Sequence, residues 1–127
     1  MTREEILALE GLELRKAVAG ANGWTARAVT PEECRRITGD YLARSLWFDE
    51  EGRWHLETLP WDSDIAAAWA LLEELSGMGL SWELGNLDPG YVLKFWQHGD
   101  FDVVGEEKDP AATVICRAYL LAKAVSA

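Results

Sequence analysis

The stretch Trp61–Leu75, WDSDIAAAWALLEEL, carries the longest helical signal in the chain, and strand-like runs flank it on both sides. Asp62 is suited to cap this helix, because its carboxylate can accept hydrogen bonds from N–H groups of the first turn. The apolar positions that recur at helical spacing are Ile65, Trp69, Leu72 and Leu75. Such a stripe normally faces a core. We therefore expect the helix to bury Trp69 against a sheet.

The composition fits one globular domain that spans residues 1–127. Apolar residues make up 49% of the chain, and a chain of this length buries roughly two-thirds of its unfolded surface. The formal charge of −10 disfavours binding to duplex nucleic acid or to anionic membranes, and it favours a basic protein partner. No apolar run is long enough to span a membrane, and the charged start MTREEILALE lacks the core of a signal peptide. We expect a cytoplasmic protein.

The N-terminal segment is expected to form one helix. Thr2 and Glu5 have the spacing of a capping box, in which each side chain accepts from the other's backbone N–H. Gly11 weakens the middle of this helix, and Asn22-Gly23 predicts the turn that ends it. Its candidate inner positions are Ile6, Leu9, Leu14 and Val18.

A short helix and a hairpin are expected next. Thr30-Pro31 places a capping residue before a proline at the first helical position, which predicts a helix through Ile37. The runs 46–48 and 54–56 are rich in aromatic and apolar residues and flank Asp49–Gly52. This pattern is typical of a β-hairpin with a four-residue loop.

Three further strands follow the central helix. Alternation or apolar runs predict strands at 80–84, 91–97 and 101–104, and the short connections between them require antiparallel neighbours. Both faces of 91–97 carry large apolar side chains, so we expect both faces to be covered. Asp109-Pro110 opens a last helix. The expected fold class is α+β, an α/β/α layered sandwich with a central, mostly antiparallel sheet and helices on both faces.

Residues with reactive side chains form no recognisable catalytic or metal-binding motif. The soft metal ligands Cys34, His55, His98 and Cys116 include no closely spaced pair, so neither a metal site nor a cofactor is expected. The two cysteines are expected to be reduced and buried, with a disulfide as the alternative. Most carboxylates fall at turns and helix caps, and no serine has a glycine-flanked elbow. No catalytic residue is assigned.

Seven tryptophans in 127 residues are the compositional anomaly of the chain. Tryptophan fills cores, but it also lines pockets because it joins a large apolar face to one N–H donor. Trp54, Trp82 and Trp96 lie on predicted strands, and Arg53 and Lys94 neighbour them in sequence. Core packing explains these residues most simply. The alternative is a pocket whose indole faces stack on a planar, nucleotide-like ligand, with the two cations beside its phosphate.

Three separated blocks resemble the phage ABA sandwich domain family, a group of small proteins encoded by phages and prophages. The blocks are TREEILALEGLELRKAVAGANGW at the start, DSDIAAAW in the middle and ICRAYLLA near the end. The resemblance leaves out Thr25–Leu59. It implies a layered helix–sheet–helix fold, a phage origin and hence a bacterial host cytoplasm, and it carries over no catalytic residue.

Three functions follow as hypotheses. The first is a non-catalytic phage accessory protein that sequesters a small nucleotide-like ligand, such as a host defence signal, through Trp54, Trp82, Trp96, Lys94 and Arg53. The second is an acidic interaction protein that docks onto and inhibits a basic host or phage protein. The third is a small nucleotide phosphodiesterase. The oligomeric state stays open, a homo-oligomer included.

Overall fold

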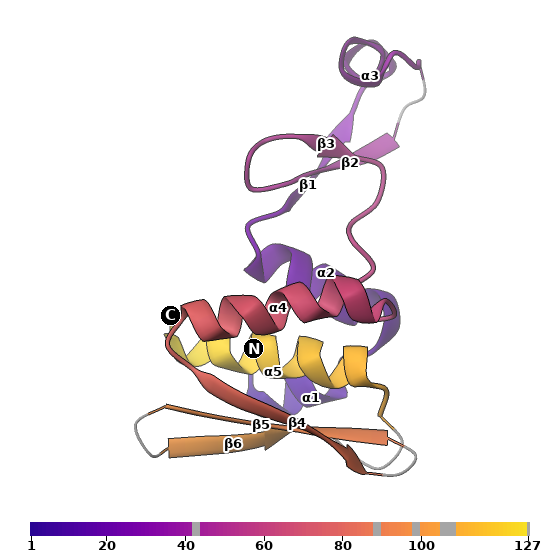
Figure 1. Ribbon diagram of the computed structural model, residues 1–127. Coiled ribbons are helices and arrows are strands. Elements are labelled where there is room, and N and C mark those ends of the chain that lie inside the picture. Colours follow the sequence, from indigo (N-terminus) through magenta and orange to yellow (C-terminus); the bar gives the residue numbers. More distant parts are fainter. Residues whose placement is uncertain (42–43, 88–89, 98–99, 105–108, 127) are drawn as a thin grey trace. The chain divides into compact units, whose positions relative to one another are not determined.

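The computed structural model describes residues 1–41, 44–87, 90–97, 100–104 and 109–126. The helices are α1 (Arg3–Ala8), α2 (Gly11–Ala21), α3 (Pro31–Thr38), α4 (Ile65–Gly77) and α5 (Ala111–Ser126). The strands are β1 (Thr25–Val29), β2 (Arg44–Phe48), β3 (Trp54–His55), β4 (Ser81–Leu87), β5 (Gly90–Gln97) and β6 (Asp100–Val104). They form two antiparallel sheets, β1-β2-β3 and β4-β5-β6 (Figure 1). The expected α+β class is confirmed.

The chain divides into two compact units, and the boundaries fall inside α2 and just before Pro60. The first unit consists of residues 1–18 and 60–127, and the second consists of residues 19–59. A single domain over 1–127 therefore remains a prediction, and each unit is described below by itself.

Helix α5 lies at the centre of the first unit. It packs against α4, α1, β5 and β6, so it has neighbours on nearly every side. Its buried residues accordingly run around the helix instead of along one stripe, and they include Val114, Ile115, Cys116, Tyr119 and Leu121. A helix that is apolar all round is an interior helix. The centre of this unit is α5, although the longest helical signal in the sequence belongs to α4.

Helix α4 is turned differently from the prediction. Its buried residues are Ala68, Leu71, Leu72 and Leu75. Ile65 and Trp69 are exposed, so the expectation of a core Trp69 is wrong. The buried set has the same i, i+3, i+4, i+7 spacing as a helix face, and the small Ala68 lets α4 approach α5 closely, while Trp69 would hold the helices apart.

The N-cap of α4 also differs from the prediction. Asp64 accepts hydrogen bonds from the N–H groups of Ala66 and Ala67, whereas the predicted cap, Asp62, binds the Arg15 side chain. The helix begins at Ile65, which places Asp62 outside its first turn. A carboxylate at the N-cap must lie directly before the first helical residue.

The N-terminal segment forms two helices instead of one. The capping box of Thr2 and Glu5 is confirmed at the start of α1. Leu9 then leaves the helical conformation, and Gly11 adopts a φ of +56°, which favours glycine. Gly11 thus separates the two helices. Three of the four predicted inner positions, Ile6, Leu14 and Val18, are buried.

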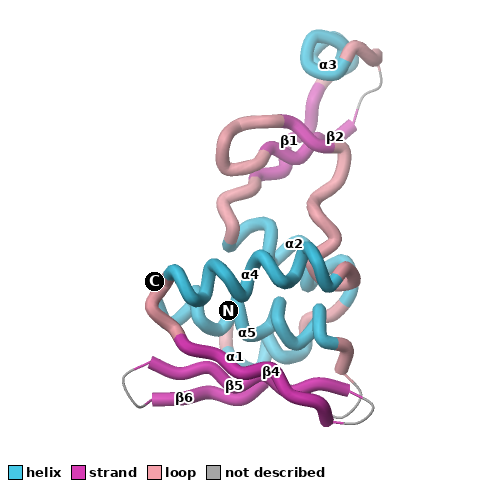
Figure 2. The backbone as a smooth tube through the Cα atoms, in the orientation of Figure 1, coloured by secondary structure: helices cyan, strands magenta, loops and turns pink. Residues whose placement is uncertain are grey.

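The β4-β5-β6 sheet has one face towards the helices. Register pairs Trp82 with Phe95, and Leu93 pairs with both Leu84 and Val104. Leu93, Phe95 and Val104 are buried, whereas Lys94 between them is exposed. In Figure 2 the helices α1, α4 and α5 lie on one side of this sheet. Helical cover on both faces was expected, and here the helices of the unit stack in layers on a single side. The predicted turn at Leu87–Gly90 lies partly outside the described residues.

The second unit contains the predicted hairpin and a strand that the sequence analysis missed. Strands β2 and β3 pair antiparallel around the Asp49–Gly52 loop, as predicted, and β1 pairs with the other edge of β2. The missed β1, TARAV, carries only one buried residue, Val29, so its sequence shows little apolar alternation. Val29 packs with Cys34 of α3 and Leu46 of β2 in a small core of its own.

Both cysteines are free and buried, as expected. Among the helices that the structure describes, none combines the length and the apolar character needed to cross a membrane.

Candidate functional site

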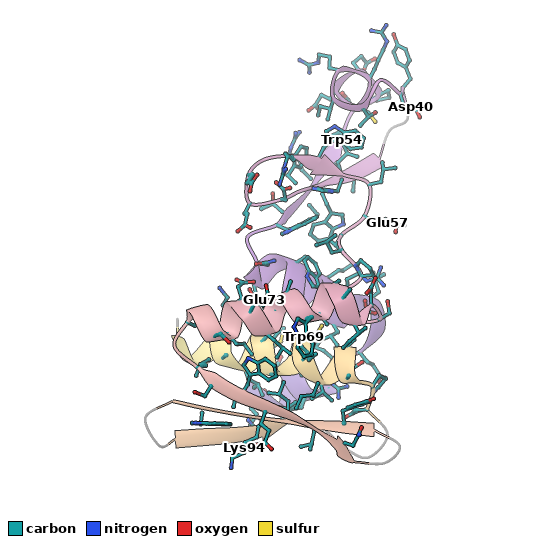
Figure 3. The ribbon with its side chains drawn as sticks, in the orientation of Figure 1. Asp40, Trp54, Glu57, Trp69, Glu73 and Lys94 are labelled. Atoms are coloured by element: carbon teal, nitrogen blue, oxygen red, sulfur yellow. The ribbon has the colours of Figure 1, made fainter. Side chains whose placement is uncertain are left out.

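Exposed aromatic surface gathers where α4 lies beside β4. Trp69 is 43% exposed and Ile65 is 49% exposed, one turn apart on α4. The Trp69 ring meets the ring of Trp82 on β4, and the indole N–H of Trp82 donates to the Ser76 hydroxyl at 3.1 Å. Figure 3 shows Trp69 on the side of α4 that faces β4. We call Ile65, Trp69, Glu73, Ser76 and Trp82 the α4–β4 surface.

The charge of the α4–β4 surface is negative. Glu73 is exposed one helical turn after Trp69, and neither α4 nor β4 contains a lysine or arginine. A phosphate group at this surface would therefore meet no cation from the two elements that build it. A cationic or apolar partner suits it better.

Lys94 and Trp96, two of the predicted ligand-binding residues, lie on the other face of the sheet. Lys94 and Trp96 are two residues apart on β5, so they share a face, and the Lys94 ammonium lies 5.7 Å from the Trp96 ring centroid. Trp82 pairs with Phe95 in register and shares the helix-covered face with it. The sheet itself thus separates Trp82 from Trp96, so these two indoles do not line one cavity.

Arg53 and Trp54 belong to the second unit. Trp54 is 41% exposed at the start of β3. The Arg53 side chain forms ion pairs with Asp49 at 3.2 Å and with Glu51 at 2.9 Å. Its charge is therefore compensated within the hairpin. The five predicted ligand-binding residues are divided between the two units, and their role in ligand binding stays a prediction.

The hairpin of the second unit is organised around the Asp49 carboxylate. One carboxylate oxygen accepts from the backbone N–H groups of Glu51 and Arg53, and the other lies 2.9 Å from His55 Nε2. The hydrogen bond with His55 is the main cause that lowers the pKa of Asp49 to about 2, and the backbone donors add to it. The His55 ring in turn lies against Trp24, with centroids 4.6 Å apart.

This Asp49–His55 pair is a structural device of the loop. A histidine held by a carboxylate also occurs in catalytic triads, but there the histidine contacts a nucleophile. Here the His55 ring contacts Asp49 and Trp24. Asp49 ties the ring to the hairpin loop, and Trp24 ties it to the turn that follows α2. These contacts stabilise the loop conformation seen in the structure.

The sequence analysis did not predict that Ile65 and Trp69 of α4 are exposed. Trp69 and Ile65 were assigned to the core because they fit a helical stripe. A competing stripe through Ala68, Leu71 and Leu75 fits equally well. The available signal was the alanine at position 68, since a small side chain lets a helix lie close to the element that covers it.

The remaining groups of interest are the possible metal ligands and the thiol of Cys116. In the part of the chain that the structure describes, no three His, Cys, Asp or Glu side chains gather as a metal site. Burial, followed by the nearby charge of Asp62, raises the pKa of Cys116 to about 12, which leaves its thiol protonated.

Comparisons with known proteins give no match. The chain matches no protein-family model, no curated protein and no solved structure.

Proposed function

We propose that this protein is a non-catalytic binding protein that docks onto a basic protein partner through the α4–β4 surface. The observation that carries the proposal is the exposure of Trp69 and Ile65 on a helix whose other face already builds the core. Two large apolar side chains one turn apart leave much of their surface in contact with water. They are the kind of residues that anchor protein interfaces.

The geometry around Trp69 suits an anchor. Its ring is held edge to face by Trp82, and Trp82 is held in turn by Ser76. A side chain that is already oriented loses less rotamer entropy on binding, so more of its contact energy appears as affinity. Tryptophan is among the residue types most enriched at binding hot spots.

The charge of the chain supports a basic partner. The net charge of −10 attracts cationic proteins and raises their association rate, and this steering weakens as salt screens it. Glu73 places one of these charges beside Trp69. Such a partner would pair a cation with Glu73 and its apolar side chains with the indole of Trp69.

The test is affinity capture from bacterial lysate at low and high salt, with quantification of each captured protein. We expect basic proteins that the wild-type chain retains at low salt and releases at high salt. Trp69→Ala should lose them, and Leu12→Ala, which removes another exposed apolar side chain, should keep them. Equal capture by Trp69→Ala and the wild type would contradict the proposal.

A second candidate follows from Lys94 above Trp96. An aromatic face with an adjacent cation suits a small, planar anion such as a nucleotide. If the resemblance to phage ABA sandwich proteins reflects ancestry, the protein would sequester this ligand in a bacterial cytoplasm.

The nucleotide candidate is tested by titrating mono- and cyclic nucleotides while tryptophan fluorescence is followed, with Trp96→Phe as the matched variant. No fluorescence change at millimolar nucleotide would contradict it. Among the described residues, no observation favours the phosphodiesterase.

A further inference from the structure

We infer that two copies of this chain associate face to face through the side of the β4-β5-β6 sheet that points away from the helices. We call this side the open face, and its described residues are Ser81, Glu83, Gly85, Val92, Lys94 and Trp96. The proposal concerns a surface other than the α4–β4 surface, so it stands independently of the proposed docking function. It shares Lys94 and Trp96 with the nucleotide candidate, which a dimer through this face would occlude.

The open face is apolar at two of its positions and has no helix over it. Val92 and Trp96 are only half-buried, whereas Leu93 and Phe95 on the other side of the same strand are buried. Register places Phe101 opposite Trp96 and Val103 opposite Lys94. Within the described part of this unit, α1, α4 and α5 all lie on the opposite side of the sheet (Figure 1). A sheet with large apolar residues on both faces is normally covered on both.

The charges on the open face identify a second copy as the occupant. Glu83 and Lys94 are direct partners in the register of β4 and β5, so one acidic and one basic side chain stand side by side. The open face is thus balanced in charge, although the whole chain carries −10. A two-fold interface must be self-complementary, because the same surface meets itself. The Glu83–Lys94 pair meets this requirement, since each charge of one copy can face the opposite charge of the other. An acidic or a basic partner would be attracted by only one of the two charges.

The shape of the open face fits the same symmetry. Gly85 faces Val92 in register, and a Cβ at Gly85 would lie at an ordinary 3.8 Å from Val92 Cγ1. Gly85 therefore adds no side chain to the open face beside Val92. A two-fold axis that lies between two facing sheets, parallel to the strands and midway between β4 and β5, lays Val92 of each copy over Gly85 of the other, where no side chain obstructs it. The same axis brings Lys94 of one copy beside Glu83 of the other.

The size of the open face sets the expected strength of the dimer. Three strands about 4.8 Å apart and about seven residues long form a small surface, below the ~800 Å² per partner of a standard interface. We expect a dimer that dissociates in the micromolar range. Sedimentation velocity should therefore cover about 5 to 500 micromolar protein.

Charge exchange between copies is the sharpest test. Lys94→Glu and Glu83→Lys each place like charges on the open face, so each variant alone should dimerise at least tenfold more weakly than the wild type. An equimolar mixture of the two variants should restore the dimer, because each copy then offers what the other lacks. Lys16→Glu, a charge reversal at an exposed position of α2, is the matched control and should dimerise as the wild type does. Far-ultraviolet circular dichroism of each variant confirms that the monomer is folded.

Two results would overturn the inference. A wild-type chain that stays monomeric at 500 micromolar excludes the dimer at any useful concentration. A dimer that neither charge reversal weakens uses another surface. If both single variants lose their fold, Gly85→Glu replaces them. It adds a charged side chain opposite Val92 of the second copy, with no positive φ to oppose it, and it must weaken the dimer for the inference to stand.

Discussion

The indole rings of Trp69 and Trp82 meet edge to face, with their centroids 5.6 Å apart and their planes at 88°. One ring comes from the exposed side of α4 and the other from the first residues of β4. This contact uses the edge of one ring and leaves much of Trp69 open to solvent. The pair therefore ties α4 to the sheet and presents an aromatic surface at the same time.

The exposure of Trp69 predicts a small effect on stability when it is removed. Trp69→Ala loses one aromatic pair, which is worth about 1 kcal/mol. Leu72→Ala, on the buried side of the same helix, opens a cavity and should cost about 2–5 kcal/mol. Urea denaturation of both variants measures the free energies of unfolding. A Trp69→Ala cost as large as that of Leu72→Ala would show that Trp69 is a core residue after all.

Two aspartates before α4 have different roles, and their substitutions should differ in cost. Asp64→Ala removes the N-cap and should lower the free energy of unfolding by about 1 kcal/mol. Asp62→Ala removes the partly buried partner of Arg15, whose Nε lies 2.6 Å from the Asp62 carboxylate. The loss of a charge-assisted hydrogen bond should cost about 2 kcal/mol. Thermal or urea unfolding ranks the two, and the reverse order would contradict this prediction.

The Asp49 carboxylate should make the second unit sensitive to acid. Folding lowers the pKa of Asp49 from 3.8 to about 2, chiefly through His55. Because the folded state holds the ionised form, this stabilisation is fully present above the unfolded pKa and is lost as the pH falls through the folded one. The Trp24 and His55 NMR signals should therefore change between about pH 4 and pH 2.

The matched variant for this acid transition is Asp49→Asn. It keeps the shape of the side chain and removes the titration, so the pH-dependent step should disappear from the hairpin signals. Glu57→Gln, an exposed carboxylate in the same unit, should leave the step unchanged. A step that survives Asp49→Asn would assign it to another group.

The two thiols should be unreactive in the folded protein. Cys116 has a pKa of about 12 and both cysteines are buried, so neither offers an accessible thiolate near neutral pH. Ellman's reagent at pH 8 should show almost no fast reaction, and two thiols should react after unfolding in guanidinium. Fast reaction of one thiol in the native protein would reveal local opening around that cysteine, and Cys34→Ser identifies which one reacts.

The sequence by itself determined the local elements that depend on contacts between near neighbours in the chain, such as helix caps and short turns. The capping box at Thr2 and the cap at Thr30 were predicted and are confirmed, because both depend on side chains that bind neighbouring N–H groups. The hairpin at Asp49–Gly52 and the antiparallel strands β4 to β6 were confirmed for a similar reason, since short connections allow few geometries.

Tertiary structure alone decided which side of each element is buried. The sequence of α4 contains two overlapping apolar stripes, and only the close approach of α5 selects the one through Ala68 and exposes Trp69. Likewise, β5 is apolar on both faces, and only the packing of α5 shows which face the helices cover. Burial depends on contacts between residues far apart in the chain, and a local pattern cannot specify them. The candidate surfaces of this protein are the apolar faces that those contacts left open.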